Sequence, residues 1–342
     1  MAVSLTKSVL LSCLLTWLLS GCSYWGTDEV QKLNGYSMGT SFTVSLVTKD
    51  STARALDGEV RTVIEEVNRS MSTYLPSSDV SRFNEAGVDE WVTVSAMTVE
   101  VVTMALAVAE VSNGAFDPTV GPLVDLWGFG PKPSTDQVPD QAKIDEVRRN
   151  IGWQAIEVDE TGKKLLKTEP RELDLSGIAK GYAVDQVAKL VENRGVDNYL
   201  VEIGGEMRFA GSKPDDQPWR VAIEAPDPEQ RSVYKVLEVT EGAMATSGDY
   251  RNFFDQDGVR YSHTLDPATG YPINHKLVSV TLLGDRCALA DAYATAFLVM
   301  GTESALELAE SEGMAVYLIE RDDTGDNVIV SDQFEALYAS ID

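Results

Sequence analysis

The sequence predicts an α+β fold, built as a single mixed α/β domain that follows an N-terminal export segment. The run 35–47, in which apolar and polar residues alternate, is typical of a half-buried strand. Other runs, such as 53–68, carry apolar residues at helical spacing. The chain has no internal repeat, no low-complexity linker and no sharp change of composition. One domain is therefore favoured over two independently folding halves.

The N-terminus has the pattern of a bacterial export signal. A positive charge precedes an apolar run over 9–19, which is too short for a comfortable membrane span. The residues Leu-Ser-Gly-Cys at 19–22 resemble the lipobox, in which the cysteine is lipidated and becomes the mature N-terminus. We expect a lipoprotein signal peptide over 1–21 and a tether over 22–34, lipidated at Cys22. The alternative is an uncleaved membrane anchor followed by a chance cysteine.

Cysteine, charge and histidine content exclude several classes of protein. Cys13 leaves with the signal and Cys22 is acylated, so Cys287 has no partner for an intramolecular disulfide. A net charge of −26 argues against nucleic-acid binding and against adhesion to anionic lipid, because both favour a basic surface. The only two histidines, His263 and His275, make a zinc cluster improbable.

The domain is expected to span 35–342 and to begin with a strand over 35–47, where Phe42, Val44 and Leu46 alternate with polar residues. Further elements are then expected in this order: helices over 53–68 and 99–111, a binding loop rich in glycine, proline and aromatic residues over 113–130, a polar loop over 131–140, and a hairpin over 156–168.

The segment Asp-Leu-Ser-Gly-Ile-Ala-Lys-Gly at 174–181 lies where a short strand over 171–175 is expected to give way to a helix. This helix is predicted to begin near Gly177 and to end at Gly195. The unpaired N–H groups at its N-terminus favour an anion, and Lys180 adds a positive charge within one turn. The segment lacks the spacing of the stronger phosphate-binding motifs, so an ordinary glycine turn stays open as the alternative.

The C-terminal half contains a candidate metal site. Its expected elements are strands over 199–203, 219–224, 277–283, 315–319 and 328–330, and helices over 285–300 and 303–312. Asp291 and Thr295 are four residues apart in the first of these helices, so they share one face. Their hard oxygen donors suit Mg²⁺, which commonly completes its coordination with water and substrate phosphate. The alanines around them fit close helix packing equally well.

A candidate catalytic residue lies in the run 261–272, which is rich in hydroxyls and in proline and glycine turns. His263, with a reference pKa of about 6.5, can take a proton from an attacking hydroxyl at neutral pH. A structural histidine that satisfies a turn is the alternative.

Eight segments in a fixed order resemble the ApbE family, the FAD:protein FMN transferases, between Tyr36 and about Gly301. They are 38–41, 72–74, 114–129, 174–183, 204–206, 246–250, 262–270 and 290–295. The resemblance implies a T-fold-like α+β catalytic domain that uses FAD as substrate and Mg²⁺ as cofactor.

The resemblance also implies site residues. The flavin contacts would be Met38, Tyr74, Ala115, Phe116, Asp117, Asp174, Lys180 and Leu265, and the Mg²⁺ ligands would be the Gly177 carbonyl with Asp291 and Thr295. Aromatic and apolar side chains can cover the flavin or adenine ring, and Lys180 can neutralise pyrophosphate oxygens.

The implied reaction is attack by a Thr or Ser hydroxyl of an acceptor protein on the FMN phosphorus, which forms a phosphodiester and releases AMP. His263 is the candidate general base and Asp266 its orienting partner, although an aspartate near the nucleophile can serve instead. Two alternatives stay open: an Mg²⁺-dependent FAD pyrophosphatase, and a flavin-binding or storage lipoprotein without catalysis.

The resemblance further implies flavin-carrying acceptor subunits of membrane complexes, such as Na⁺-translocating NADH:quinone reductase or the related Rnf complex. We expect the protein in the bacterial cell envelope, lipid-anchored to a membrane and facing the periplasm.

Overall fold

An eight-stranded antiparallel sheet organises the computed structural model, which describes residues 29–130, 137–227 and 232–338. The strand order is β1-β2-β6-β7-β10-β13-β14-β15. The strands are β1 (Glu29–Ser37), β2 (Thr40–Thr48), β6 (Tyr199–Ile203), β7 (Glu206–Ala210), β10 (Glu241–Gly248), β13 (Leu277–Gly284), β14 (Ala315–Asp322) and β15 (Gly325–Val330). The α+β class predicted from the sequence is confirmed.

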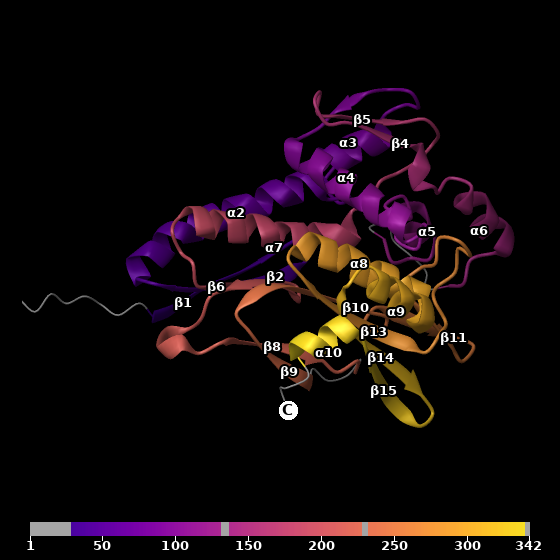
Figure 1. The fold of residues 1–342 in the computed structure, drawn as a ribbon. Coiled ribbons are helices and arrows are strands. Elements are labelled where there is room, and N and C mark those ends of the chain that lie inside the picture. Colours follow the sequence, from indigo (N-terminus) through magenta and orange to yellow (C-terminus); the bar gives the residue numbers. More distant parts are fainter. Residues whose placement is uncertain (1–28, 131–136, 228–231, 339–342) are drawn as a thin grey trace, which may run out of the picture.

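Helices cover one face of this sheet (Figure 1). They are α2 (Asp50–Met71), α7 (Ser176–Asn193) and α8 (Cys287–Met300). Two further helices, α4 (Ala96–Val111) and α9 (Thr302–Ser311), pack against α8. The opposite face packs against the hairpin of β8 (Trp219–Glu224) and β9 (Val233–Val239) and against α10 (Asp332–Tyr338).

Along the central strands, successive apolar side chains point alternately to the two faces of the sheet. In β10, Ala243 and Ala245 pack with the helices, whereas Met244 between them packs with the β8–β9 cluster. In β14, Leu318 faces the helices and Tyr317 faces α10. Because successive side chains of a strand point to opposite faces, the sheet is buried on both sides.

A smaller group of elements is attached beyond the helices, at the top and right of Figure 1. It comprises α3 (Asp79–Glu85), β3 (Val92–Thr93), α5 (Gly121–Leu126), α6 (Gln141–Arg148), β4 (Ile156–Asp159) and β5 (Lys164–Lys167). A further hairpin is formed by β11 (Phe253–Gln256) and β12 (Val259–Ser262). Its aromatic side chains stack on Trp127, which directly follows α5. Short 3-10 helices lie at Trp153–Ala155 and Pro214–Asp216.

Most elements expected from the sequence are present. The helices predicted over 53–68, 99–111, 285–300 and 303–312 correspond to α2, α4, α8 and α9, and the hairpin over 156–168 is formed by β4 and β5. Helix α7 begins at Ser176, next to the expected start at Gly177. Gly195 follows its end with a φ of +75°, as a helix-terminating glycine does.

The strand predicted over 171–175 is wrong. These residues are extended and Leu173 and Leu175 are buried, but their polar groups bond to other segments. Both the N–H and the carbonyl of Leu173 bond to the Asn84 side chain, and the N–H of Asp174 donates to the Pro118 carbonyl. The alternation of apolar and polar residues correctly indicates an extended backbone. The hydrogen bonds that a neighbouring strand would make are made here by a side chain and a loop carbonyl.

The single strand predicted over 35–47 is also wrong, because the chain reverses between Ser37 and Thr40. The turn places Met38 at a φ of +50° and Gly39 at +74°, and β1 and β2 pair on either side of it. The alternation of Phe42, Val44 and Leu46 belongs to β2 alone. Strand β1 begins at Glu29, so regular structure starts within the predicted tether over 22–34.

The predicted signal over 1–21 and Cys22 lie outside the described residues. Among the residues that are described, no helix is long and apolar enough to cross a membrane. The predicted binding loop over 113–130 contains the short helix α5, and 131–136 of the polar loop also lie outside the described residues.

Candidate active site

A pocket of about 530 Å³ lies where α7, α8 and the end of β10 meet the loop after α4 and the segment after β12. Most of the site residues expected from the sequence line it, although they come from segments far apart in the chain. They are Tyr74, Ala115, Phe116, Asp117, Asp174, Gly177, Lys180, His263, Leu265, Asp291 and Thr295. The volume is in the usual range for a ligand-binding cleft.

Met38 and Asp266 are not among the residues that line this pocket. Met38 lies in the β1–β2 turn and packs against the main core. The contact of this region with the pocket comes three residues later, where the Ser41 carbonyl accepts from the N–H of the pocket residue Gly204. The Asp266 carboxylate accepts from the N–H of Ala268 at 2.8 Å and so closes its own turn.

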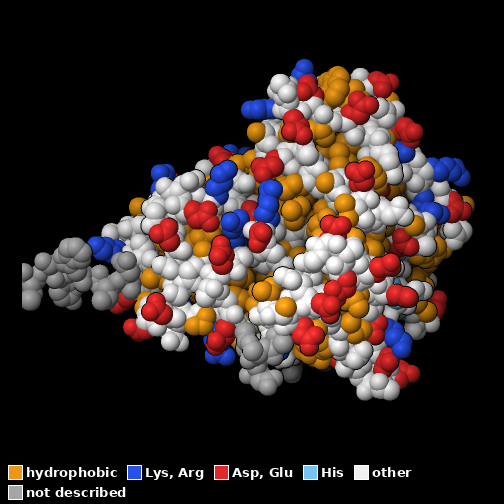
Figure 2. All heavy atoms as spheres, in the orientation of Figure 1, with side chains coloured by type: hydrophobic (Ala, Val, Ile, Leu, Met, Phe, Trp, Pro, Cys, Tyr) orange, Lys and Arg blue, Asp and Glu red, His pale blue; other side chains and the backbone are white. Residues whose placement is uncertain are grey.

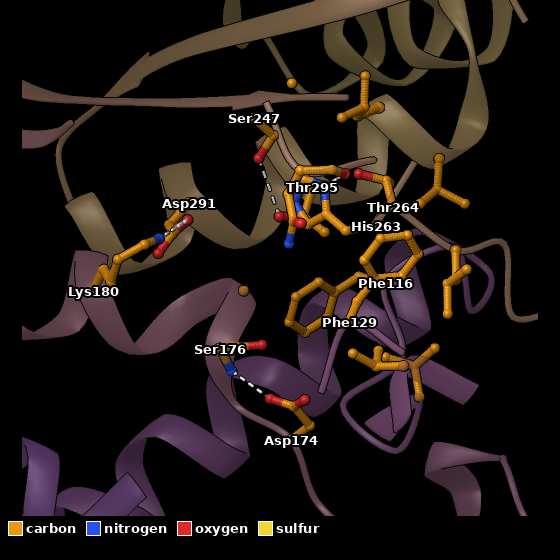
Figure 3. A pocket seen from close by; sticks show the side chains of 18 of the residues that line it. Phe116, Phe129, Asp174, Ser176, Lys180, Ser247, His263, Thr264, Asp291 and Thr295 are labelled. Atoms are coloured by element: carbon orange, nitrogen blue, oxygen red, sulfur yellow. Dashed lines mark hydrogen bonds and ion pairs between the residues drawn. The ribbon is translucent and has the colours of Figure 1, made fainter. Parts of the chain in front are cut away.

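The start of α7 forms one wall. Asp174 accepts a hydrogen bond from the N–H of Ser176 at 2.9 Å, so its carboxylate lies at the helix N-terminus (Figure 3). A Cβ on Gly177 would lie 3.1 Å from the Phe116 ring and 3.4 Å from the Thr295 hydroxyl. Glycine therefore lets the α7 backbone approach both the aromatic wall and α8 closely.

Helices α7 and α8 are held together just behind the pocket. A Cβ on Gly181 would lie 2.3 Å from the Cys287 carbonyl oxygen, so only glycine permits this crossing. The buried Asp185 carboxylate accepts from the N–H groups of Cys287 and Ala288, both at 3.0 Å. Because no side chain of α8 caps its own start, Asp185 does so from α7.

The candidate metal ligands come from two helices: Asp291 and Thr295 lie on successive turns of α8, and Gly177 lies at the start of α7. Asp291 is 3% exposed, and one of its oxygens accepts from the N–H of Gly181 at 3.0 Å. The Thr295 hydroxyl is 3.1 Å from that of Ser247 on β10 (Figure 3). The described residues hold no group of three or more histidine, cysteine, aspartate or glutamate side chains suited to a metal. One carboxylate with a hydroxyl and a carbonyl fits a hard cation that keeps water and phosphate ligands.

Lys180 supplies a fixed positive charge at the pocket. Its ammonium is 2.9 Å from Glu206 and 3.7 Å from Asp291. Burial lowers the pKa of Lys180, but the two carboxylates raise it by more, so the net pKa lies above its ordinary value. Burial raises the pKa of Glu206 to about 7, against the opposing effect of Lys180. The short contact with an ammonium that keeps its proton favours the ionised form of Glu206.

His263 follows β12 directly, and its ring is held by the backbone. Nδ1 lies 3.2 Å from the Asn252 carbonyl, which accepts only if Nδ1 carries the proton. That tautomer leaves Nε2 as a proton acceptor. Burial lowers the pKa of His263, and the nearby Lys180 lowers it further, so the ring is neutral at pH 7. In this structure Asn252, rather than Asp266, is the hydrogen-bond partner of the ring.

Aromatic side chains complete the walls. Phe116 is buried, Phe129 packs edge-on against the His263 ring, and Tyr74 is 69% exposed at the pocket. Asp117 is a supporting residue, since its carboxylate accepts from the N–H and hydroxyl of Thr119. Burial raises the pKa of Asp117.

Several pocket residues were not assigned a role from the sequence. Glu206 lies in a segment that carries the resemblance, as does Ser247, but neither has a motif of its own. Asn252 contributes only a backbone carbonyl to His263, which no side-chain pattern can reveal. Asp185, which lies behind the pocket, reads in the sequence as an ordinary helix residue. A polar position within an apolar helix face is the only sequence signal for it.

Comparisons with known proteins agree over most of the chain. The model of the ApbE family matches residues 38–318. The chain is 43% identical over 321 residues to the FAD:protein FMN transferase of Vibrio cholerae, covering 93% of this chain and 95% of that protein. It is 40% identical over 305 residues to the FAD:protein FMN transferase of Haemophilus influenzae, covering 87% and 88%.

Solved structures give the same result. The flavin transferase ApbE from Vibrio cholerae aligns with a TM-score of 0.84 at 42% identity, covering 90% of this chain and 99% of that one. The apo form of the Pseudomonas stutzeri flavinyl transferase ApbE aligns with a TM-score of 0.84 at 39% identity, covering 91% and 97%. Since sequence and fold agree over nearly the full length of these proteins, this chain belongs to the ApbE family.

Proposed function

We propose that this protein transfers the FMN part of FAD to a Thr or Ser hydroxyl of an acceptor protein. The proposal rests on one pocket, in which the Lys180 ammonium and the neutral imidazole of His263 meet two oxygen ligands suited to Mg²⁺. These ligands are the side chains of Asp291 and Thr295. The named activity of the relatives supports it. The chemistry is phosphoryl transfer, for which positioning and charge stabilisation do most of the work.

The reaction forms one bond and breaks one bond at the FMN phosphorus. The acceptor oxygen bonds to the FMN phosphorus, the bond from that phosphorus to the bridging oxygen breaks, and AMP leaves with the electron pair. The hydroxyl proton passes to Nε2 of His263, which is neutral and held through Nδ1 by the Asn252 carbonyl. Lys180 stabilises negative charge on the pyrophosphate oxygens.

The oxygen ligands in the pocket support a requirement for Mg²⁺. The side chains of Asp291 and Thr295, with the Gly177 carbonyl, would hold the ion. Bound there, Mg²⁺ would neutralise phosphate charge as a Lewis acid. The flavin itself would lie against Phe116 and Leu265, with Tyr74 at the open side.

We further propose that the protein is lipidated at Cys22 and faces the periplasm, anchored to a membrane of the bacterial cell envelope. The lipobox-like residues 19–22 support this. An anchored transferase would meet acceptors in the same membrane, and flavin-carrying subunits of Na⁺-translocating NADH:quinone reductase or Rnf-type complexes are the acceptors we propose. Replacing Cys22 with serine should abolish labelling by a radioactive fatty acid and release the protein from membrane fractions.

The activity is tested by incubating the protein with FAD, Mg²⁺ and an acceptor subunit, followed by the intact mass of the acceptor and an assay of AMP. A mass gain of one FMN that EDTA prevents would support both the transfer and the cation. AMP with free FMN and an unmodified acceptor would indicate a pyrophosphatase. FAD binding without any AMP would instead indicate a storage protein.

A further inference from the structure

Three charged side chains from α7, β7 and α8 meet at the pocket. The Lys180 ammonium lies 2.9 Å from an oxygen of Glu206 and 3.7 Å from an oxygen of Asp291. The side chains of Glu206 and Asp291 are only 5% and 4% exposed, whereas that of Lys180 is 30% exposed. Two buried carboxylates thus share one ammonium, and the group carries one excess negative charge.

The distances show which carboxylate holds the ammonium. At 2.9 Å, Lys180 donates a hydrogen bond to Glu206, whereas 3.7 Å to Asp291 is too long for one. The other oxygen of Asp291 is already bonded to the N–H of Gly181. The Asp291 oxygen nearest Lys180 therefore keeps its lone pairs, although an ammonium lies close to it, as Figure 3 shows for these two side chains.

Glu206 is held tightly where this arrangement needs it. It is the first residue of β7, directly after the turn at Gly204 and Gly205, whose φ values are +66° and +109°. A Cβ on Gly204 would lie 3.3 Å from Oε2 of Glu206, so glycine leaves room for the carboxylate. Oε2 is buried and has no hydrogen-bond partner among the described residues.

An unpartnered buried carboxylate oxygen is costly, and a well-packed apolar side chain would serve stability at least as well. The role of Glu206 must therefore lie in what its other oxygen does, which is to hold Lys180. In a pocket built for a cation and an anionic pyrophosphate, the position of one ammonium decides whether the two binding sites compete.

We propose that Glu206 is a positioning residue that holds the Lys180 ammonium off Asp291, leaving Asp291 for a divalent cation and Lys180 for the pyrophosphate. The inference rests on the proposed function, because it concerns the same pocket. Without Glu206, Lys180 would bond directly to Asp291, the nearest remaining carboxylate, and would occupy the oxygen that the cation needs.

The test is a double-mutant cycle read by binding rather than by turnover. Mg²⁺ affinity is measured by calorimetry, and FAD affinity by fluorescence in EDTA, on the full chain in detergent. The variants are Glu206→Gln, Lys180→Met and the double substitution. Glu206→Gln keeps the size of the side chain, and circular dichroism establishes that each variant is folded.

We expect Glu206→Gln to weaken Mg²⁺ binding roughly tenfold through coupling to Lys180. Lys180→Met should then raise Mg²⁺ affinity much more in the Glu206→Gln background than in the wild type. Glu202→Gln is the matched control, since Glu202 belongs to the same hairpin, bonds to the N–H of Gly205 and does not line the pocket. It should change Mg²⁺ affinity by no more than about twofold.

Equal effects of Lys180→Met in both backgrounds would overturn the inference, because Glu206 would then contribute charge alone. If Glu206→Gln does not fold, Glu206→Asp replaces it in the cycle, since the shorter side chain should also release Lys180. A wild-type protein that binds neither Mg²⁺ nor FAD would instead refute the proposed function.

Discussion

The same three elements, α7, β7 and α8, are joined by two buried charge clusters of opposite design. In the first, Asp185 of α7 meets Arg208 of β7 at 3.1 Å and caps the start of α8 through two N–H groups. In the second, Lys180 of α7 meets Glu206 of β7 and Asp291 of α8.

We call the first cluster balanced because both oxygens of its buried carboxylate are bonded, to the Arg208 guanidinium and to the N–H groups at the positive end of α8. Arg208 also lies 3.6 Å from the carboxylate of the more exposed Glu192. The second cluster is unbalanced, because two buried carboxylates share one ammonium and Oε2 of Glu206 has no partner among the described residues. A cluster whose buried oxygens are all bonded fixes the helices, whereas the unbalanced one a turn away is open to a ligand.

Removing a ligand of the unbalanced cluster should have the largest effect on activity. Asp291→Ala should lower the transfer rate by about 10³-fold, comparable to losing a preorganised charge-stabilising group, because the cation site loses its only carboxylate. Mass spectrometry of the acceptor gives the rate. Asp285→Ala, which removes the same charge from an exposed position just before α8, is the control and should keep near-normal transfer. Comparable rates for the two variants would contradict the metal site.

The ring of His263 has a hydrogen-bond partner at Nδ1, and no described residue bonds to its Nε2. His263→Ala should lower kcat by about 10²-fold while FAD affinity stays within a factor of about two, as expected for loss of a general base. The other histidine provides the control, because His275 lies beside Gly301 and does not line the pocket. Normal transfer by His263→Ala would move the base elsewhere.

The same residue predicts a pH profile. A base acts when it is unprotonated, and burial lowers the pKa of His263 from its ordinary value of 6.5. The midpoint of the acid limb of the rate profile should therefore lie below pH 6.5, with full activity on the alkaline side. A profile of kcat/KM against pH whose acid midpoint lies at or above 6.5 would show that another group, or a solvated imidazole, takes the proton.

Breaking the balanced cluster should affect stability instead of chemistry. Asp185→Asn should lower the free energy of unfolding by about 2–3 kcal/mol, because one of the two oxygens that accept from the N–H groups of α8 becomes an amide donor. The partly exposed Arg208 would also keep only the more distant Glu192 as a charged partner. Urea unfolding measures the change, with the exposed Asp197→Asn as control. A large loss of Mg²⁺ affinity with unchanged stability would mean that the two clusters are not separate in function.

The smallest effect concerns the backbone contact between the clusters. Gly181→Ala should destabilise the protein by about 1–2 kcal/mol, since its Cβ would meet the Cys287 carbonyl. Gly58→Ala is the matched helix variant, because nothing lies within 4 Å of a Cβ there. It should stabilise by about 0.5–1 kcal/mol through helix propensity. If thermal unfolding gives both variants the same sign, the crossing of α7 and α8 is looser than described.

Elements that depend on local information could be predicted from the amino-acid sequence. Helical spacing located α2, α4, α7, α8 and α9, and the i, i+4 pair of Asp291 and Thr295 followed from one helix face. The ordered motifs determined the family and most of the pocket residues. Local information failed at 171–175, where an extended segment bonds to Asn84 instead of a strand, and at the reversal around Met38.

The contacts between distant groups follow from the packing of the folded chain. The partner of the His263 ring is the backbone carbonyl of Asn252, and the partner of Lys180 is Glu206, 26 residues further along the chain. The capping of α8 by Asp185 bridges 102 residues. These contacts depend on the crossing of α7 over α8 and on the register of β7, and a single sequence records neither, because spacing encodes a residue's own face but not what packs against it.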